Sequence, residues 1–163
     1  MSAEEPFEPE RVVEKLNGAG VRYVVVGGLA SGAHGVIRAT RALELVPDPE
    51  PANMAALAGV LRRLGARHPT ELALLDGESL SRPVSMKLLT RHGEIHVLNR
   101  MPGTPPFEQL QAESFSVEVN PGIQAPICSL HHLRKMKSAS TRERDAVDLA
   151  ELDELHGPGV GGC

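Results

Sequence analysis

The feature that most constrains the fold is a short apolar run that ends in two glycines. Residues 23–26 are Tyr-Val-Val-Val, and Gly27 and Gly28 follow directly. A near-continuous apolar run rich in valine is typical of a strand buried on both faces, and glycine permits a tight turn into a following helix. The sequence therefore predicts a buried strand over 22–26, a glycine turn and a short helix over 29–35.

The rest of the chain predicts strands that alternate with helices early, hairpins in the middle and helices at the end. The other expected helices cover 8–19, 52–64, 129–138 and 142–155, and the other expected strands cover 41–46, 84–91, 94–98, 115–119 and 123–128. Residues 1–7 are expected to fray, 65–81 to be less regular and 101–107 to form a loop. This order predicts an α/β (α+β) fold, a mixed sheet flanked by helices. We expect one domain over 1–156 and a disordered glycine-rich tail over 157–163.

Composition disfavours several classes of protein. Aromatic residues make up only 2% of the 163 residues, so the core must be aliphatic and few rings are offered for stacking single-stranded bases. The net charge of −4 provides no global basic field for nucleic acid, and two cysteines are too few for a disulfide scaffold. No apolar run approaches the ~20 residues that span a bilayer. The N-terminus lacks the apolar centre of a signal peptide, so a cytoplasmic protein without membrane contacts is expected.

The glycine turn is a candidate phosphate site. A strand that ends in glycines and enters a helix presents backbone N–H groups at the helix N-terminus, which attracts anions. Gly27 and Gly28 would let a triphosphate approach without a Cβ clash, and Ser31 could add a hydroxyl. A tight turn without a ligand has the same pattern, and the glycine pair alone favours that simpler interpretation.

The strand expected over 41–46 carries the second candidate site. Ala42 and Glu44 are two residues apart, so their side chains point to the same face. An acid at each position would hold divalent ions against the bound phosphates, as in two-metal phosphoryl transfer. A third acid from a neighbouring strand would complete such a site.

Several motifs occur in a specific order. They are Val-Val-Val-Gly-Gly-Leu-Ala at 24–30, Ala-His-Gly at 33–35, Arg-Ala-Thr-Arg at 38–41, Leu-Glu-Leu-Val at 43–46 and the segment 136–149. Together they resemble the minimal nucleotidyltransferase family, and within it the branch of AbiEii-like and MenT-like toxins of bacterial toxin–antitoxin systems. The resemblance runs from about residue 10 to residue 156. It implies transfer of a nucleoside monophosphate from a nucleoside triphosphate to an acceptor such as tRNA or protein, with Mg²⁺ or Mn²⁺ as cofactor and an antitoxin as partner.

The resemblance also implies a triad of acids, and this chain departs from it. Aspartates are expected at positions 42, 44 and 96, where the chain has Ala42, Glu44 and His96. Magnesium prefers oxygen ligands, whereas imidazole suits zinc, nickel or copper. The departure predicts either a degenerate site or a site in which Glu44 and His96 hold a different metal. Two ligands without a third favour the degenerate site.

Basic residues complete the expected nucleotide site. Arg38 and Arg41 flank the degenerate strand, where they could steer phosphates. The segment that resembles the C-terminal helical motif implies phosphate or acceptor contacts from Lys137, Arg142 and Arg144. Because Arg144 and Asp148 are four residues apart on an expected helix, a plain surface ion pair fits them equally well.

Two groups of histidines are alternative metal ligands. His92, Glu94 and His96 alternate and would share one face of an uninterrupted strand, but a turn at His92-Gly93 would break the alternation. His131 and His132 are adjacent on an expected helix, where neighbouring side chains diverge by ~100°. Surface histidines are therefore the expected interpretation of that pair.

Two functions remain from the sequence. One is a nucleotidyltransferase with an impaired or altered metal site. The other is a catalytically inactive relative that binds nucleotide, RNA or a protein partner through the same cleft. The absence of acids at positions 42 and 96 favours the second.

Overall fold

The computed structural model describes residues 6–68, 76–82 and 85–159. Its centre is a six-stranded sheet in the order β3-β4-β2-β1-β6-β5. The strands are β1 (Tyr23–Val26), β2 (Ala42–Pro47), β3 (Ser85–Thr90), β4 (Gly93–Leu98), β5 (Phe115–Asn120) and β6 (Ile123–Ile127). β1 is antiparallel to β2 and parallel to β6, and β2 is parallel to β4, so the sheet is mixed.

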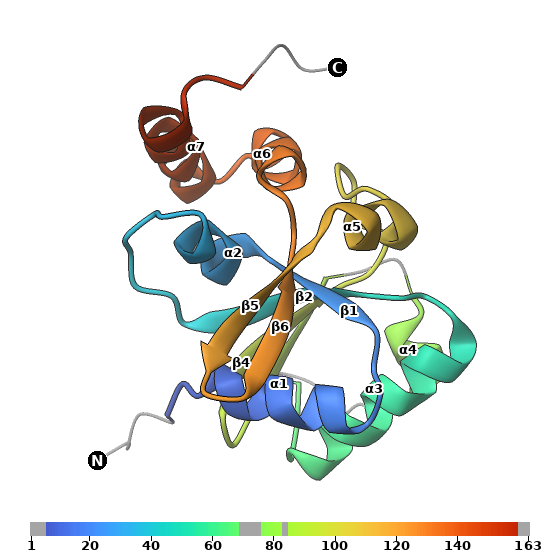
Figure 1. Cartoon of the computed structure of the whole chain (residues 1–163). Helices are drawn as coiled ribbons and strands as arrows, with labels where there is room; N and C mark the ends of the chain where they lie inside the picture. Colours follow the sequence, from blue (N-terminus) through green and yellow to red (C-terminus); the bar gives the residue numbers. More distant parts are fainter. Residues whose placement is uncertain (1–5, 69–75, 83–84, 160–163) are drawn as a thin grey trace.

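Helices pack around this sheet. They are α1 (Pro9–Gly18), α2 (Gly27–Ala33), α3 (Pro51–Arg63), α4 (Gly77–Leu80), α5 (Phe107–Glu113), α6 (Leu130–Ser138) and α7 (Glu143–His156). Figure 1 shows α2, α6 and α7 grouped above the strands in that view, with α1 and α3 below them. α6 packs against both α2 and α7. The predicted mixed α/β fold is confirmed, and none of the helices within the described ranges is both long and apolar enough to cross a bilayer.

The core is aliphatic, as the composition requires. All four residues of β1 are buried, which matches a strand covered on both faces. Leu43, Leu45 and Ile95 from the neighbouring strands are at most 1% exposed. Of the described aromatic residues, Tyr23 and Phe107 are in the buried core.

Two short helices differ from the sequence-based expectation. α5 begins at Phe107, the last residue of the expected loop, and α4 lies in the stretch expected to be irregular. α5 buries only Phe107 and Leu110. Two apolar positions are too few to establish a helical period from sequence, and such short helices depend on tertiary packing rather than on propensity.

The ends of the chain fall largely outside the described residues. The N-terminal stretch expected to fray is described only at residues 6–7, and the expected tail only over 157–159. At the beginning of that tail, Nη2 of Arg134 donates a hydrogen bond to the carbonyl of Gly157. The last described residues therefore lie against α6.

Candidate functional site

The side chains of Glu44 and Arg38 cover the glycine turn. β1 passes directly into α2 at Gly27, whose φ of +69° favours glycine. A Cβ on Gly27 would lie 1.8 Å from Oε2 of Glu44, and a Cβ on Gly28 would lie 2.7 Å from Nη2 of Arg38. Ser31 is fully buried and donates a hydrogen bond to the carbonyl of Gly27. A phosphate could reach this turn only if Glu44 and Arg38 moved.

Alanine at Gly27 is therefore expected to destabilise the protein by about 2–3 kcal/mol, since it strains the backbone and displaces the Glu44 carboxylate. Gly20 is the matched control, because it has a φ of +70° with nothing within 4 Å of an added Cβ. Urea denaturation of Gly27→Ala and Gly20→Ala separates backbone strain from the clash. Equal losses in the two variants would show that Glu44 does not rest on Gly27.

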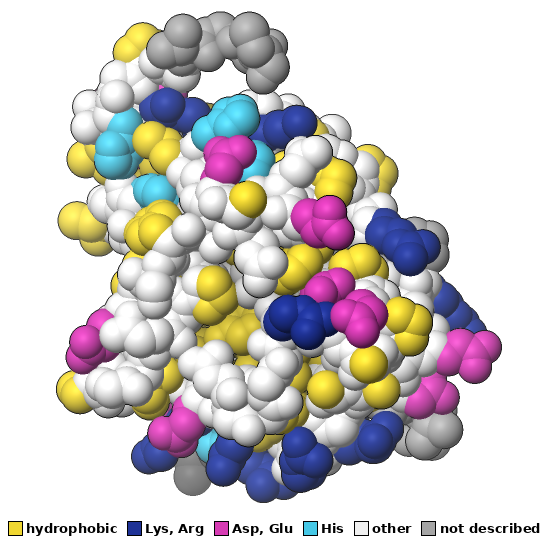
Figure 2. Space-filling model, turned by 45° about the vertical axis from the view of Figure 1, so that its right-hand side comes forward, with side chains coloured by type: hydrophobic (Ala, Val, Ile, Leu, Met, Phe, Trp, Pro, Cys, Tyr) yellow, Lys and Arg dark blue, Asp and Glu magenta, His cyan; other side chains and the backbone are white. Residues whose placement is uncertain are grey.

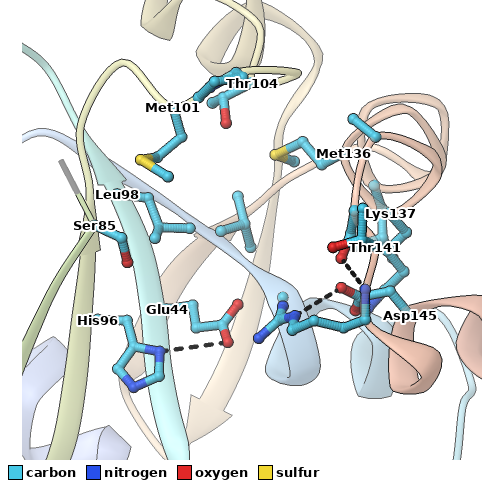
Figure 3. Close-up of a pocket in the computed structure, with 17 residues that line it drawn as sticks. Glu44, Ser85, His96, Leu98, Met101, Thr104, Met136, Lys137, Thr141 and Asp145 are labelled. Carbon is cyan, nitrogen blue, oxygen red and sulfur yellow. Dashed lines mark hydrogen bonds and ion pairs between the residues drawn. The ribbon is translucent and has the colours of Figure 1, made fainter. Parts of the chain in front are cut away.

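Glu44 and His96 face each other across two parallel strands. They are register partners in β2 and β4, and Oε1 of Glu44 is 3.6 Å from Nδ1 of His96 (Figure 3). Nε2 of His96 is 3.3 Å from Oε2 of Glu94, and Nζ of Lys87 is 3.2 Å from the other oxygen of Glu94. The imidazole thus lies between two carboxylates, in a row of charged side chains that crosses β2, β4 and β3.

Ala42 is beside this row. It is the register partner of Glu94 and is 8% exposed. Its side chain is on the same face of β2 as that of Glu44. Position 42, where the family resemblance implies an aspartate, therefore lies on the Glu44 face of β2 and offers no ligand atom.

The segment that resembles the C-terminal helical motif forms a buried ion cluster opposite these strands. Nζ of Lys137 is 3.1 Å from Oδ1 of Asp145 and 2.8 Å from Oδ2 of Asp148, and all three side chains are at most 4% exposed. Nη2 of Arg38 approaches Asp148 at 3.4 Å, while its buried Nε has no hydrogen-bond partner among the described residues. Burial opposes ionisation of Asp145, but hydrogen bonds from Ser140 and Lys137 outweigh it and lower the pKa of this carboxyl.

The remaining arginines differ in their access to the cleft. Nε of Arg142 is 3.0 Å from Oδ2 of Asp145, and the Arg142 side chain is 59% exposed. Arg41 and Arg144 are exposed and do not line the cleft. The possible Arg144–Asp148 pair does not form, because Asp148 is buried against Lys137 and Arg38 instead.

The Glu44–His96 pair and part of the ion cluster line a cleft of about 410 Å³. Glu44 and His96 form one wall, Lys137 and Arg142 form the facing wall, and Gly27 also lines it. Figure 3 shows the apolar side chains of Leu98, Met101 and Met136 along another side of the cleft. The volume is within the range of small-molecule sites, so the cleft could hold one nucleotide-sized ligand.

The donor set of the cleft does not fit magnesium. Of positions 42, 44 and 96 only Glu44 supplies an oxygen, and Glu94 lies on the far side of His96. Asp145 also lines the cleft, but it is paired with Lys137 and Arg142. Because Mg²⁺ requires several oxygen ligands in a tight octahedron, these residues provide too few.

The two alternative groups of histidines agree only in part with the expectations from the sequence. His92 precedes β4 and its Nδ1 is 3.0 Å from Oε1 of Glu8, so the turn separates it from His96. The expectation of two surface histidines is wrong for His132, which is only 3% exposed. His131 and His132 both lie against Glu113, at the end of the unpredicted helix α5. Without that helix, no sequence signal linked Glu113 to them.

Comparisons with solved structures establish the fold. The chain superposes on the lincomycin-bound lincosamide antibiotic adenylyltransferase LnuA with a TM-score of 0.61 and 14% identity, over 93% of this chain and 99% of that one. An antigenic nucleotidyltransferase-like protein from Paracoccidioides brasiliensis gives a TM-score of 0.59 and 14% identity, over 90% and 72%. ANT(2″)-Ia in complex with adenylyl-2″-tobramycin gives 0.50 and 12%, over 90% and 95%.

The chain has a nucleotidyltransferase-type fold. No protein-family model matches the sequence, and no curated protein sequence matches it either. The likeness thus lies in the arrangement of the sheet and helices rather than in the amino-acid sequence. The place of this chain in the toxin branch stays a prediction from the motifs.

Proposed function

We propose that this protein binds a nucleoside phosphate in the cleft between Glu44 and α7, and that its magnesium-dependent nucleotidyl transfer is lost or severely impaired. The observation that carries the proposal is the composition of the cleft. Lys137 and Arg142 line the cleft opposite Glu44 and His96. The resemblance implies acids at positions 42, 44 and 96, where the chain has Ala42, Glu44 and His96. The nucleotidyltransferase-type fold supports nucleotide binding, and the scarcity of oxygen ligands at these positions supports the loss of magnesium-dependent transfer.

The N-terminus of α7 is the best place for the phosphates. Ser140, Thr141 and Arg142 immediately precede this 14-residue helix and all line the cleft. A helix N-terminus offers unpaired N–H groups and a favourable dipole for an anion. Arg142 uses Nε for Asp145, which leaves the rest of its exposed guanidinium for a phosphate. The glycine turn, already covered by Glu44 and Arg38, is the less accessible alternative.

The experiment is a calorimetric titration with ATP, GTP, CTP and UTP, each with and without Mg²⁺. We expect at least one nucleotide to bind, with little dependence on Mg²⁺. Arg142→Gln is expected to weaken that binding about tenfold or more, because a hydrogen bond to a charged group contributes about 1.5–3 kcal/mol. Arg144→Gln is the matched control, since Arg144 is exposed in the same segment but lies outside the cleft. No binding to the folded wild type, or equal losses in both variants, would contradict the proposal.

A second candidate is an active transferase that moves a nucleoside monophosphate to tRNA, to a protein or to a small hydroxyl compound. Two of the structural neighbours carry an antibiotic or its adenylylated form, and the segment 136–149 resembles a toxin motif. Incubation with labelled nucleotides, Mg²⁺ or Mn²⁺, and tRNA or total protein tests it. Incorporation that Arg142→Gln abolishes would replace the first proposal by this one, and an adjacent antitoxin gene would then support a toxin role.

A further inference from the structure

Two helices meet at a carboxylate and two imidazoles outside the nucleotide cleft. Glu113 ends α5, and His131 and His132 lie in the first turn of α6. Nδ1 of His131 is 3.3 Å from Oε1 of Glu113, and Nε2 of His132 is 3.2 Å from Oε2. Ser129, the N-cap of α6, lies with its hydroxyl 3.3 Å from Oε1 of Glu113 and holds the carboxylate in place. Figure 2 shows histidine side chains gathered around an acidic one on the upper part of the face.

The adjacent histidines converge because they use different ring nitrogens. Nδ1 of His131 is close to the backbone, whereas Nε2 of His132 is at the far end of its ring. This difference in reach compensates for the angle between neighbouring helical positions. The two rings are stacked with centroids 5.1 Å apart and an interplanar angle of 27°. One ligand atom from each of the three side chains lies within 4.8 Å of the others.

The three side chains are close enough together to share one metal ion. At ligand distances of about 2.0–2.1 Å, two ligand atoms of a tetrahedral zinc site are about 3.3–3.4 Å apart. His131 lies 3.3 Å from Oε1 of Glu113 and His132 lies 3.2 Å from Oε2, so each His–Glu separation is close to that value. With one ligand atom taken from each side chain, all separations are within 4.8 Å, and small side-chain adjustments would bring the three atoms around one ion. We propose that Glu113, His131 and His132 bind a divalent transition metal ion, and that Zn²⁺ suits this donor set best.

Solvent can reach two of the three groups. The side chains of Glu113 and His131 are 46% and 61% exposed, so an ion can enter and water can supply a fourth ligand. A metal ion bound there would link α5 to α6 at the base of the β5–β6 hairpin.

The test is a Zn²⁺ titration of untagged, metal-stripped protein by calorimetry, with Co²⁺ as the spectroscopic probe. We expect one equivalent of zinc to bind and to raise the melting temperature. His131→Asn and Glu113→Gln are each expected to weaken zinc binding at least tenfold, the lower end of the loss when even a supporting residue is removed. His131 and Glu113 are exposed, so both variants should fold, and their melting curves without metal verify this.

Two further variants test whether zinc binds at this cluster rather than at other histidines. His156→Asn removes an exposed histidine of α7 outside the cluster and is expected to bind zinc like the wild type. Glu44→Gln/His96→Asn removes the pair in the nucleotide cleft and is also expected to retain zinc. The proposal is overturned if the folded wild type takes up no zinc, if His131→Asn binds it unchanged, or if the cleft variant is the one that loses it.

Discussion

Replacing Lys137 with methionine is expected to destabilise the protein by about 3 kcal/mol. Lys137 is 4% exposed and its ammonium joins Asp145 to Asp148. Removing one partner of a buried ion pair leaves an uncompensated charge, which costs about 3–5 kcal/mol. We expect the lower end of this range, because Arg38 still contacts Asp148 and Arg142 still contacts Asp145. Urea denaturation of Lys137→Met against the wild type measures the loss.

Lys135 provides the control for this substitution. It is an exposed lysine on the same helix, and Lys135→Met is expected to change the free energy of unfolding by no more than about 0.5 kcal/mol.

The difference in the free energy of unfolding between the wild type and Lys137→Met should also become smaller in acid. Because the pKa of Asp145 is lowered on folding, the wild type loses this contribution as the pH falls below about 4. A Lys137→Met protein as stable as the wild type at pH 7 would show that the cluster is not buried.

The second large effect is expected from restoring acids on the sheet. In Ala42→Asp/His96→Asp, four carboxylates would occupy neighbouring register positions, at residues 42, 44, 94 and 96 of β2 and β4. We expect this variant to be less stable than the wild type without metal, because like charges are adjacent. Mg²⁺ should then stabilise it by about 2.7 kcal/mol at a hundredfold excess over its Kd, a rise of about 5–10 °C in melting temperature.

The uncharged counterpart isolates the role of the carboxylates. Ala42→Asn/His96→Asn has side chains of the same shape and is expected to melt at the same temperature with and without Mg²⁺. The wild type is expected to be equally insensitive, because only Glu44 of the three positions offers an oxygen. An absence of any magnesium effect on the folded double aspartate variant would show that positions 42, 44 and 96 do not converge on one ion.

Elements with a strong local pattern could be predicted from the sequence. The all-apolar β1 and the stripe of Met54, Leu57 and Leu61 on α3 determine their own structure, and both are buried. α5 could not be predicted, because only Phe107 and Leu110 are buried and the helix depends on the core they enter.

Some contacts of the candidate site could likewise be predicted from the sequence, and others could not. The family resemblance implied that positions 44 and 96 contribute to one site, and the parallel pairing of β2 with β4 makes Glu44 and His96 register partners. The ion cluster did not follow, because Arg38 reaches Asp148 from a distant loop and no local spacing encodes that contact. Burial of His132 against Glu113 was missed for the same reason, since it joins segments on either side of the β5–β6 hairpin.

The pairing of β1 with β6 has a consequence for how the protein is made. Val25 and Ile127 are partners about a hundred residues apart in the chain. During synthesis, β1 can pair early with β2, but its other edge stays open until β6 leaves the ribosome. Such distant pairing slows folding and leaves an apolar strand edge exposed meanwhile. Nascent chains truncated before residue 123 should therefore remain protease-sensitive and bound by chaperones.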